Sequence, residues 1–201
     1  MTRITLALTG ASGMAYGLRL LECLLRAGCQ VDLLVSQAAR IVAKQELDLQ
    51  LPSGNAELAA FFARRHADHG GRLNVYGKEE WFAPAASGSN PAAAVVVCPC
   101  TMGTLAAIAQ GLADNLIERA ADVMLKEKRP LLLVPRETPF SLIHLRNMTT
   151  LAEAGATILP ANPGFYHRPE SVEQVVDFIV ARVLDHLGIA HDLMRPWGAH
   201  D

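Results

Sequence analysis

Short apolar runs that alternate with segments of helical periodicity are the feature that most constrains the fold. The runs RITLALTG (residues 3–10) and QVDLLVS (30–36) are each followed by a helical pattern, at residues 14–28 and 37–47. Such an order is typical of parallel strands joined by right-handed helical crossovers. The sequence therefore predicts an α/β fold, a Rossmann-like three-layer arrangement around an open parallel sheet.

The remainder of the chain continues this alternation. Further strands are expected at residues 92–100, 130–135 and 156–160, and further helices at 101–113, 114–128, 141–155 and 171–188. The polar residues 48–80 are interpreted as an insertion that holds one helix, at 55–67. Residues 189–201 are expected to form an extended C-terminal tail. No repeat or linker divides the 201 residues, so residues 1–201 are predicted to form a single domain.

Composition narrows the classes of partner. The formal net charge is −2 and no long run of Lys or Arg occurs, which argues against nucleic acid or a membrane surface as a partner. No stretch approaches the ~20 apolar residues of a membrane span. The first apolar run is too short for a signal peptide, so a cytoplasmic protein with reduced cysteines is expected. The spacing Cys98-x-Cys100 is unlike a zinc motif, and no metal site is predicted.

Polar residues gather where the predicted strands end. TGASG (9–13) follows the first strand, Ser36 the second, CPCTMGT (98–104) the third, PRETP (135–139) the fourth and PANPGFYHRP (160–169) the last. Ligands of open parallel sheets bind at the carboxyl ends of the strands. These five segments are therefore the candidate site.

Two of these segments begin helices with hydroxyl groups and glycine. Free N–H groups at a helix start, together with the helix dipole, favour an anion. TGASG is not the G-x-G-x-x-G motif, and Ser36 stands where a nicotinamide enzyme would carry an acidic residue. A mononucleotide therefore fits better than NAD. The alternative, that both segments are ordinary tight turns with capping hydroxyls, remains open at this point.

The longer motifs carry a family resemblance. TGASGMAYGLRLLE, ASGS (86–89), the block from CPCTMGTLAAIAQ through PRETPFSLIHLRNM, and ANPGFYHRP together closely resemble the flavin prenyltransferases of the UbiX type. These belong to the wider family of flavin-containing decarboxylase-like proteins. The resemblance implies a homododecamer that binds FMN and joins the dimethylallyl group of dimethylallyl monophosphate to N5 and C6 of reduced FMN. It also implies a UbiD-type decarboxylase as recipient of the prenylated FMN, often in ubiquinone biosynthesis.

The same resemblance implies the site residues. For FMN it indicates Gly10, Ala11, Ser12, Ser36, Thr101, Met102, Gly103, Thr104, Arg119 and Arg136. For the prenyl phosphate it indicates Lys126, Arg136, Tyr166 and Arg182, with Trp81 near the prenyl group. For catalysis it indicates Ser12, Glu46 and Glu137.

The residue chemistry agrees with this assignment. The sequence has no D-D-x-x-D pair for magnesium, and Arg, Lys and Tyr can hold a monophosphate leaving group through charge-assisted bonds without a metal. Lys126 and Arg182 can also be read as ordinary exposed helix positions. Two alternative functions remain: a flavin-dependent decarboxylase of the phosphopantothenoylcysteine decarboxylase type, and a flavin carrier without chemistry of its own.

Overall fold

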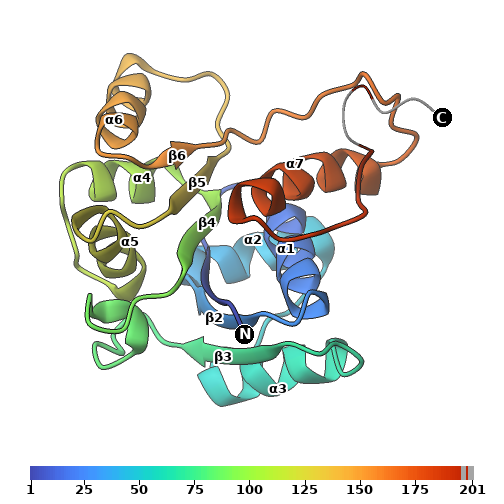
Figure 1. Ribbon diagram of the computed structural model, residues 1–201, viewed down its shortest axis with the longest axis horizontal. Coiled ribbons are helices and arrows are strands. Elements are labelled where there is room, and N and C mark those ends of the chain that lie inside the picture. Colours follow the sequence, from blue (N-terminus) through green and yellow to red (C-terminus); the bar gives the residue numbers. More distant parts are fainter. Residues whose placement is uncertain (196–197, 199–201) are drawn as a thin grey trace.

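The computed structural model describes residues 1–195 and 198, which form a three-layer α/β domain (Figure 1). The strands in this part of the chain are β1 (Arg3–Leu8), β2 (Gln30–Val35), β3 (Arg72–Tyr76), β4 (Ala94–Cys100), β5 (Leu131–Pro135) and β6 (Thr157–Ile158). The helices are α1 (Met14–Arg26), α2 (Gln37–Leu47), α3 (Asn55–Arg65), η1 (Pro84–Ala86), α4 (Met102–Ala109), α5 (Leu116–Lys126), α6 (Leu142–Glu153) and α7 (Val172–Leu187).

All strand pairs in the described residues are parallel, in the order β3-β2-β1-β4-β5-β6. The predicted α/β class and open parallel sheet are therefore confirmed. The order reverses between β1 and β4, since the chain leaves β1 toward β2 on one side and returns to β4 on the other. Ligands of doubly wound sheets bind at this switch point.

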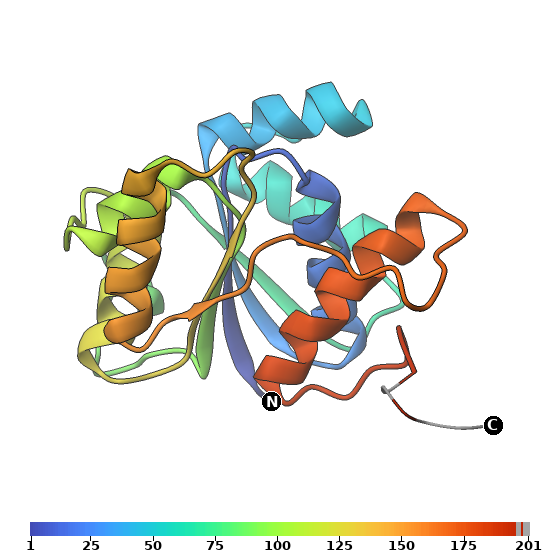
Figure 2. The same ribbon diagram turned by 90° about the horizontal axis from the view of Figure 1, so that it is seen from above.

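Two apolar cores cover the two faces of the sheet. One contains side chains of α1, α3 and α7, and the other contains side chains of α4, α5 and α6. Figure 2 shows these helix groups on opposite sides of the sheet, with α2 lying across the edge at which β1 leads into α1. This edge carries the carboxyl ends of the strands. No helix among the described residues is long and apolar enough to cross a bilayer.

Hydroxyl side chains cap two of the predicted helices. The Thr101 hydroxyl accepts a hydrogen bond from the Thr104 amide (3.1 Å), and the Ser171 hydroxyl accepts one from the Gln174 amide (3.3 Å). Each bond satisfies one of the amides that a first helical turn leaves free. Both residues begin the helices expected at residues 101–113 and 171–188, so the predicted starts of α4 and α7 are confirmed.

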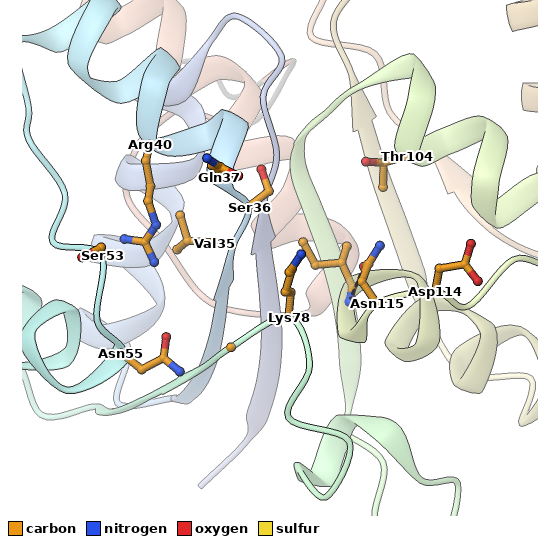
Figure 3. A pocket seen from close by; sticks show the side chains of 12 residues that line it. Val35, Ser36, Gln37, Arg40, Ser53, Asn55, Lys78, Thr104, Asp114 and Asn115 are labelled. Atoms are coloured by element: carbon orange, nitrogen blue, oxygen red, sulfur yellow. Dashed lines mark hydrogen bonds between the residues drawn. The ribbon is translucent and has the colours of Figure 1, made fainter.

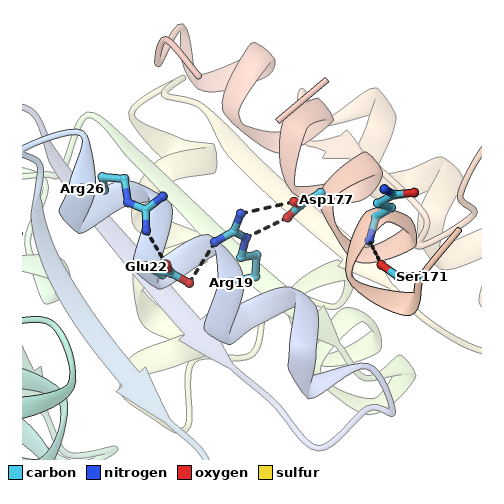
Figure 4. A network of polar contacts seen from close by, with 6 residues as sticks. Arg19, Glu22, Arg26, Ser171 and Asp177 are labelled. Carbon is cyan, nitrogen blue, oxygen red and sulfur yellow. Dashed lines mark hydrogen bonds and ion pairs between the residues drawn. The ribbon is translucent and has the colours of Figure 1, made fainter. Parts of the chain in front are cut away.

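Ion pairs fasten the first helix to the last one. The Arg19 guanidinium donates two hydrogen bonds to the Asp177 carboxylate, at 2.7 and 3.2 Å, and also pairs with Glu22, which accepts from Arg26 (Figure 4). Bidentate geometry makes the α1–α7 bond the strongest of this group. It fixes α7, the last helix, against the first crossover of the sheet.

The polar segment 48–80 contains α3, which was predicted, and β3, which was not. β3 is an edge strand in which Asn74 pairs with Asp32 in register and donates a hydrogen bond to its carboxylate (2.9 Å). The Asp32 side chain is fully buried and also lies 3.7 Å from Arg3. Asn74 is polar because it hydrogen-bonds to the buried Asp32 carboxylate, and for this reason RLNVY was not recognised as a strand. Residues 189–195 have no regular helix or strand, and the rest of the predicted tail, apart from Gly198, lies outside the described residues.

Gly17 permits the close approach of α1 to β4. A Cβ at this position would lie 2.3 Å from the Cys98 carbonyl oxygen and 2.5 Å from Leu8 Cδ2. We expect Gly17→Ala to destabilise the fold by about 1–3 kcal/mol through overpacking, although Ala is normally the better helix former. Urea unfolding followed by circular dichroism measures the effect.

Gly103→Ala is the matched control, because a Cβ at Gly103 in α4 would have its nearest neighbour at 4.0 Å. The free energy of unfolding of this variant should equal that of the wild type or exceed it by up to about 1 kcal/mol. Equal stability changes in the two variants would contradict the close-approach explanation.

Candidate functional site

Thr9 joins the two loops at the switch point. Its buried hydroxyl donates to the Pro99 carbonyl oxygen (2.7 Å) and accepts from the Thr101 amide (2.9 Å). The turn after β1 is thereby tied to the turn after β4. Both predicted hydroxyl-rich helix starts lie side by side at one edge of the sheet.

The start of α1 holds an anion that belongs to the chain itself. Gly13 is the N-cap residue in a left-handed conformation (φ 104°) and offers no side chain. The Glu46 carboxylate, from the last turn of α2, accepts hydrogen bonds from the Gly13 amide (3.0 Å to each oxygen) and the Met14 amide (2.9 Å). The amides at this helix start, predicted to favour an anion, therefore bind an internal carboxylate.

Glu46 is also linked to two other predicted residues. Burial raises the pKa of its carboxyl, but hydrogen bonds from Ser12 and from the Met14 and Gly13 amides, with the nearby Arg136 charge, bring the net pKa below its ordinary value. Arg136 Nε in turn donates to the Ser12 carbonyl oxygen (3.2 Å). An ionised carboxylate, a hydroxyl and a guanidinium thus meet beside the carboxyl ends of β1 and β5.

A cavity of about 440 Å³ opens at the same edge, between α2 and the starts of α4 and α5 (Figure 3). Ser36 and Thr104 line it, and both hydroxyls are engaged as acceptors. Ser36 Oγ accepts from the Ala39 amide (3.0 Å), and Thr104 Oγ1 accepts from Thr101 Oγ1 (2.9 Å). Each hydroxyl therefore keeps its own proton for a further acceptor, such as an anionic ligand.

The turn itself is tightly packed. A Cβ at Gly10 would lie 2.4 Å from Ala38 Cβ, so glycine lets the β1 turn approach α2. Ala11 is buried and Met102 nearly so, while Gly103 has open space beside its Cα. The residues predicted to hold FMN at these two turns are therefore brought together.

Sequence reasoning missed several polar residues of the cavity. Arg40, Lys78 and Asn115 are among those that line it together with the predicted hydroxyls. Arg40 lies one helical turn after Ser36, a spacing that could have revealed it. Lys78 follows the edge strand that the sequence did not predict, and Asn115 caps α5 by accepting from two amides.

Arg119 and Lys126 lie on α5, away from this cluster. Arg119 Nε donates to the Ala86 carbonyl oxygen (3.0 Å), and Lys126 Nζ lies 2.5 Å from the Glu127 carboxylate. A Cβ on Gly88 would come 2.9 Å from Lys126 Nζ, so the ASGS loop borders the end of α5. This end leads into β5, at the amino edge of the sheet, opposite Ser12 and Glu46.

Tyr166 and Arg182 form a third group, on the outer side of α7. They border a cavity of about 830 Å³ between α7 and the residues after it. Arg182 donates to the Asp185 carboxylate (2.7 Å), whose other oxygen lies 3.0 Å from His191 Nε2. Tyr166 is largely exposed. This chain does not bring the predicted prenyl-phosphate residues Lys126, Tyr166 and Arg182 to Arg136.

Of the remaining predicted residues, Trp81 is exposed and Glu137 is partly buried. Trp81 is 44% exposed, and the Glu137 carboxylate accepts a hydrogen bond from the adjacent Thr138 amide (3.0 Å). Three histidines have packing or capping roles: His66 stacks on His69, and His144 caps α6 with Ser141. No group of His, Cys, Asp and Glu in residues 1–195 and 198 is arranged to hold a metal ion.

Comparison with known proteins identifies the family. The family model described as Flavoprotein matches residues 1–184. The flavin prenyltransferase UbiX of Pseudomonas aeruginosa is 55% identical over 196 residues, covering 98% of this chain and 94% of the relative. The chain belongs to the UbiX flavin prenyltransferase family.

Two solved structures of the family share the fold. The crystal structure of AnUbiX in complex with FMN and dimethylallyl pyrophosphate has a TM-score of 0.88 and 38% identity, covering 100% of this chain and 99% of that one. A dodecameric FMN-dependent UbiX-like decarboxylase from Escherichia coli O157:H7 has a TM-score of 0.84 and 37% identity, covering 98% and 100%. The resemblance inferred from the sequence is confirmed.

The Glu46 carboxylate of α2, which caps the start of α1, gives a pH-dependent prediction. Because the pKa of Glu46 in the folded UbiX-family chain is below its ordinary ~4.3, its stabilisation is present above that value and is lost as pH falls through the lowered pKa. We expect Glu46→Gln to cost about 1 kcal/mol at pH 7, the size of a lost cap on a partly exposed site.

Unfolding curves between pH 7 and pH 3 test this expectation. The stability difference between wild type and Glu46→Gln should shrink below about pH 4. Asp48→Asn, a nearby carboxylate paired with Lys44 on the surface, serves as control and should change little at pH 7. A Glu46→Gln difference that stayed constant down to pH 3 would refute the capping role.

Proposed function

We propose that the chain is a flavin prenyltransferase that joins the dimethylallyl group of dimethylallyl monophosphate to N5 and C6 of reduced FMN. The observation that carries the proposal is the cluster of Ser12, Glu46 and Arg136 beside a hydroxyl-lined cavity at the switch point of the sheet. The prenylated FMN would serve a UbiD-type decarboxylase, often in ubiquinone biosynthesis.

The residues at the switch point fit FMN. Ser36 and Thr104 offer free hydroxyl protons, Gly103 leaves open space at the start of α4, and that helix start faces the same edge. Donors of this kind suit a phosphate and a ribityl chain. Bound reduced FMN supplies the nucleophilic ring atoms, N5 and C6, that accept the prenyl group.

Arg136 would hold the prenyl phosphate with Lys126, Tyr166 and Arg182. The C–O bond of the substrate breaks and phosphate leaves with the bonding electrons, so negative charge grows on its oxygens. Charge-assisted donors stabilise that growing charge more than the ground state. Trp81 would offer an aromatic face to the allylic carbon as it becomes cationic.

Glu46 and Glu137 would handle the protons of ring closure: the prenyl double bond takes up a proton as its far carbon bonds to C6, and C6 then loses its own proton. The Glu46 carboxylate is ionised at neutral pH and bonds to the Ser12 hydroxyl, so Ser12 can relay a proton to it. Glu137, next to Arg136 and partly buried in this chain, would act when substrate and neighbouring chains enclose it.

A homo-oligomer, with twelve subunits as in the E. coli relative, would complete the site. The three groups are separate in one chain: Ser12, Glu46 and Arg136 lie at the carboxyl edge, Lys126 at the opposite edge and Arg182 on the outer side of α7. One phosphate cannot contact all of them within one chain. Exposed apolar residues of α6, namely Leu142, Ile143 and Leu145, offer a surface for such contacts.

Activity is tested by mass spectrometry of the flavin extracted after incubation with FMN, a reductant and dimethylallyl monophosphate. We expect a flavin heavier by one dimethylallyl group. Arg136→Ala should slow its formation about tenfold to a hundredfold, the effect of one lost charge-assisted contact. Lys44→Gln, an exposed charge on α2, is the control.

The same experiment separates the alternatives. A carrier would release unmodified FMN, and a decarboxylase of the phosphopantothenoylcysteine type would release carbon dioxide from a carboxylated thiol without changing the flavin. Running the reaction with dimethylallyl pyrophosphate, the compound in the AnUbiX crystal, compares the two leaving groups.

Mixing two inactive variants tests the shared site. Ser12→Ala and Arg182→Ala each remove one group, and subunits of the two variants, dissociated and reassembled together, should regain activity. Random pairing restores roughly a quarter of the sites when two chains build each one. Ser12→Ala mixed with Glu46→Gln is the control, because both residues lie in one cluster and no site regains both. Equal activity in the two mixtures, or a monomer by light scattering, would contradict the shared site.

A further inference from the structure

The Arg182 guanidinium is held by two side chains that the proposed function does not use. Arg182 lies on α7 and donates from Nη1 to one oxygen of the Asp185 carboxylate (2.7 Å). The other Asp185 oxygen lies 3.0 Å from Nε2 of His191, in the segment that follows α7. Both carboxylate oxygens are therefore engaged, one by the cation and one by the imidazole.

The chain after α7 folds back so that His191 reaches Asp185. Gly188 ends the helix in a left-handed conformation (φ 65°), and its amide donates to the Asp185 carbonyl oxygen (3.0 Å). Glycine in this conformation is a common way for a helix to end. Figure 1 shows the segment returning along α7, and Ile189 and Leu193 pack against the same apolar core as that helix. His191 thus lies between two residues that fix its backbone.

His191 is a largely buried group on an otherwise open surface. Its side chain is 13% exposed, whereas that of Asp185 is 47% exposed and that of Arg182 52%. The second ring nitrogen, Nδ1, is buried and has no hydrogen-bond partner within residues 1–195 and 198. A proton on Nδ1 would be a buried donor without an acceptor, which is unfavourable. The proton therefore belongs on Nε2, from which the imidazole donates to Asp185.

The bond from His191 strengthens the hold of Asp185 on the arginine. An exposed pair three residues apart on a helix is usually weak, because keeping two flexible side chains in one geometry costs conformational entropy. A largely buried ring that donates to the carboxylate lowers this cost by fixing the carboxylate beforehand. A guanidinium has five N–H groups, so Arg182 can bind a phosphate with the others while Asp185 holds one.

We propose that Asp185 and His191 are positioning residues of the prenyl transfer, which hold the Arg182 guanidinium in the orientation that binds the phosphate of the prenyl donor. This inference rests on the proposed function, since that function assigns Arg182 to the phosphate. All three side chains border the 830 Å³ cavity together with Tyr166, the other phosphate residue proposed on this surface. A cation that is oriented in advance loses less freedom when the phosphate binds.

A purely structural role for the pair predicts a different result. If Asp185 and His191 only fasten the segment after α7, their loss affects the protein whether or not the guanidinium is present. A positioning role acts through Arg182, so it disappears once Arg182 is replaced. A double-mutant cycle on the kinetics of transfer therefore separates the two roles.

The experiment measures kcat and KM for dimethylallyl monophosphate with reduced FMN, in the assembled full-length protein. We expect Asp185→Asn and His191→Phe each to lower kcat/KM about twofold to tenfold, the effect of one lost hydrogen bond, with FMN affinity unchanged. His191→Gln keeps an N–H donor and should retain more of the rate than His191→Phe. In an Arg182→Ala background, none of these changes should have a further effect.

Two neighbouring positions supply matched controls. His186→Gln replaces a histidine that follows Asp185 on α7 and borders a different cavity. Asp192→Asn replaces an exposed carboxylate next to His191 in the chain. Both variants should have wild-type kinetics.

Three outcomes would overturn the inference. Equal losses of kcat/KM with and without Arg182 would make Asp185 and His191 structural, and wild-type kinetics in both single variants would make them dispensable. Wild-type kinetics in Arg182→Ala would remove the residue they position. Each of these outcomes leaves the prenyltransferase assignment intact, whereas wild-type protein that forms no prenylated flavin would overturn the proposed function itself.

Discussion

The hydroxyl of Thr9 is the interaction on which the site depends. Thr9 follows β1 and is 1% exposed, and its hydroxyl makes both bonds to the end of β4, donating to the Pro99 carbonyl oxygen and accepting from the Thr101 amide. A buried hydroxyl that makes both bonds fixes the two backbones, because losing either partner would leave a polar group unsatisfied. The starts of α1 and α4 thereby keep one relative position at the switch point.

Two anion-binding helix starts at one edge would compete for a single ligand if both were open. The chain resolves this by placing Glu46 on the α1 amides. Its negative charge disfavours a phosphate there and attracts Arg136. The cavity beside α2 and α4, with Arg40 and free hydroxyl protons, remains for the ligand anion. The FMN site proposed at the switch point is consistent with this division of charge.

The sequence allowed most of the sheet to be predicted, because buried parallel strands such as Val95–Val97 form uninterrupted apolar runs and hydroxyl residues mark the helix starts. β3 escaped prediction because an edge strand needs only partial burial, and Asn74 serves Asp32 rather than the apolar core. Arg40 was not predicted because a single arginine on a helix is usually exposed to solvent. Its partial burial depends on the segment around Pro52, and the periodicity of the helix carries no information about that segment.

Chain topology explains why a single subunit leaves the proposed site incomplete. In a right-handed crossover the helix starts at the carboxyl edge and returns the chain to the amino edge of the sheet. Asn115, at the start of α5, accordingly borders the 440 Å³ cavity, whereas Lys126, at its end, lies beside the beginning of β5. Motion of a side chain cannot span that helix, which is about 16 Å long for its 11 residues. If Lys126 contacts the same phosphate as Arg136, it has to come from another copy of the chain, so assembly becomes a condition of catalysis.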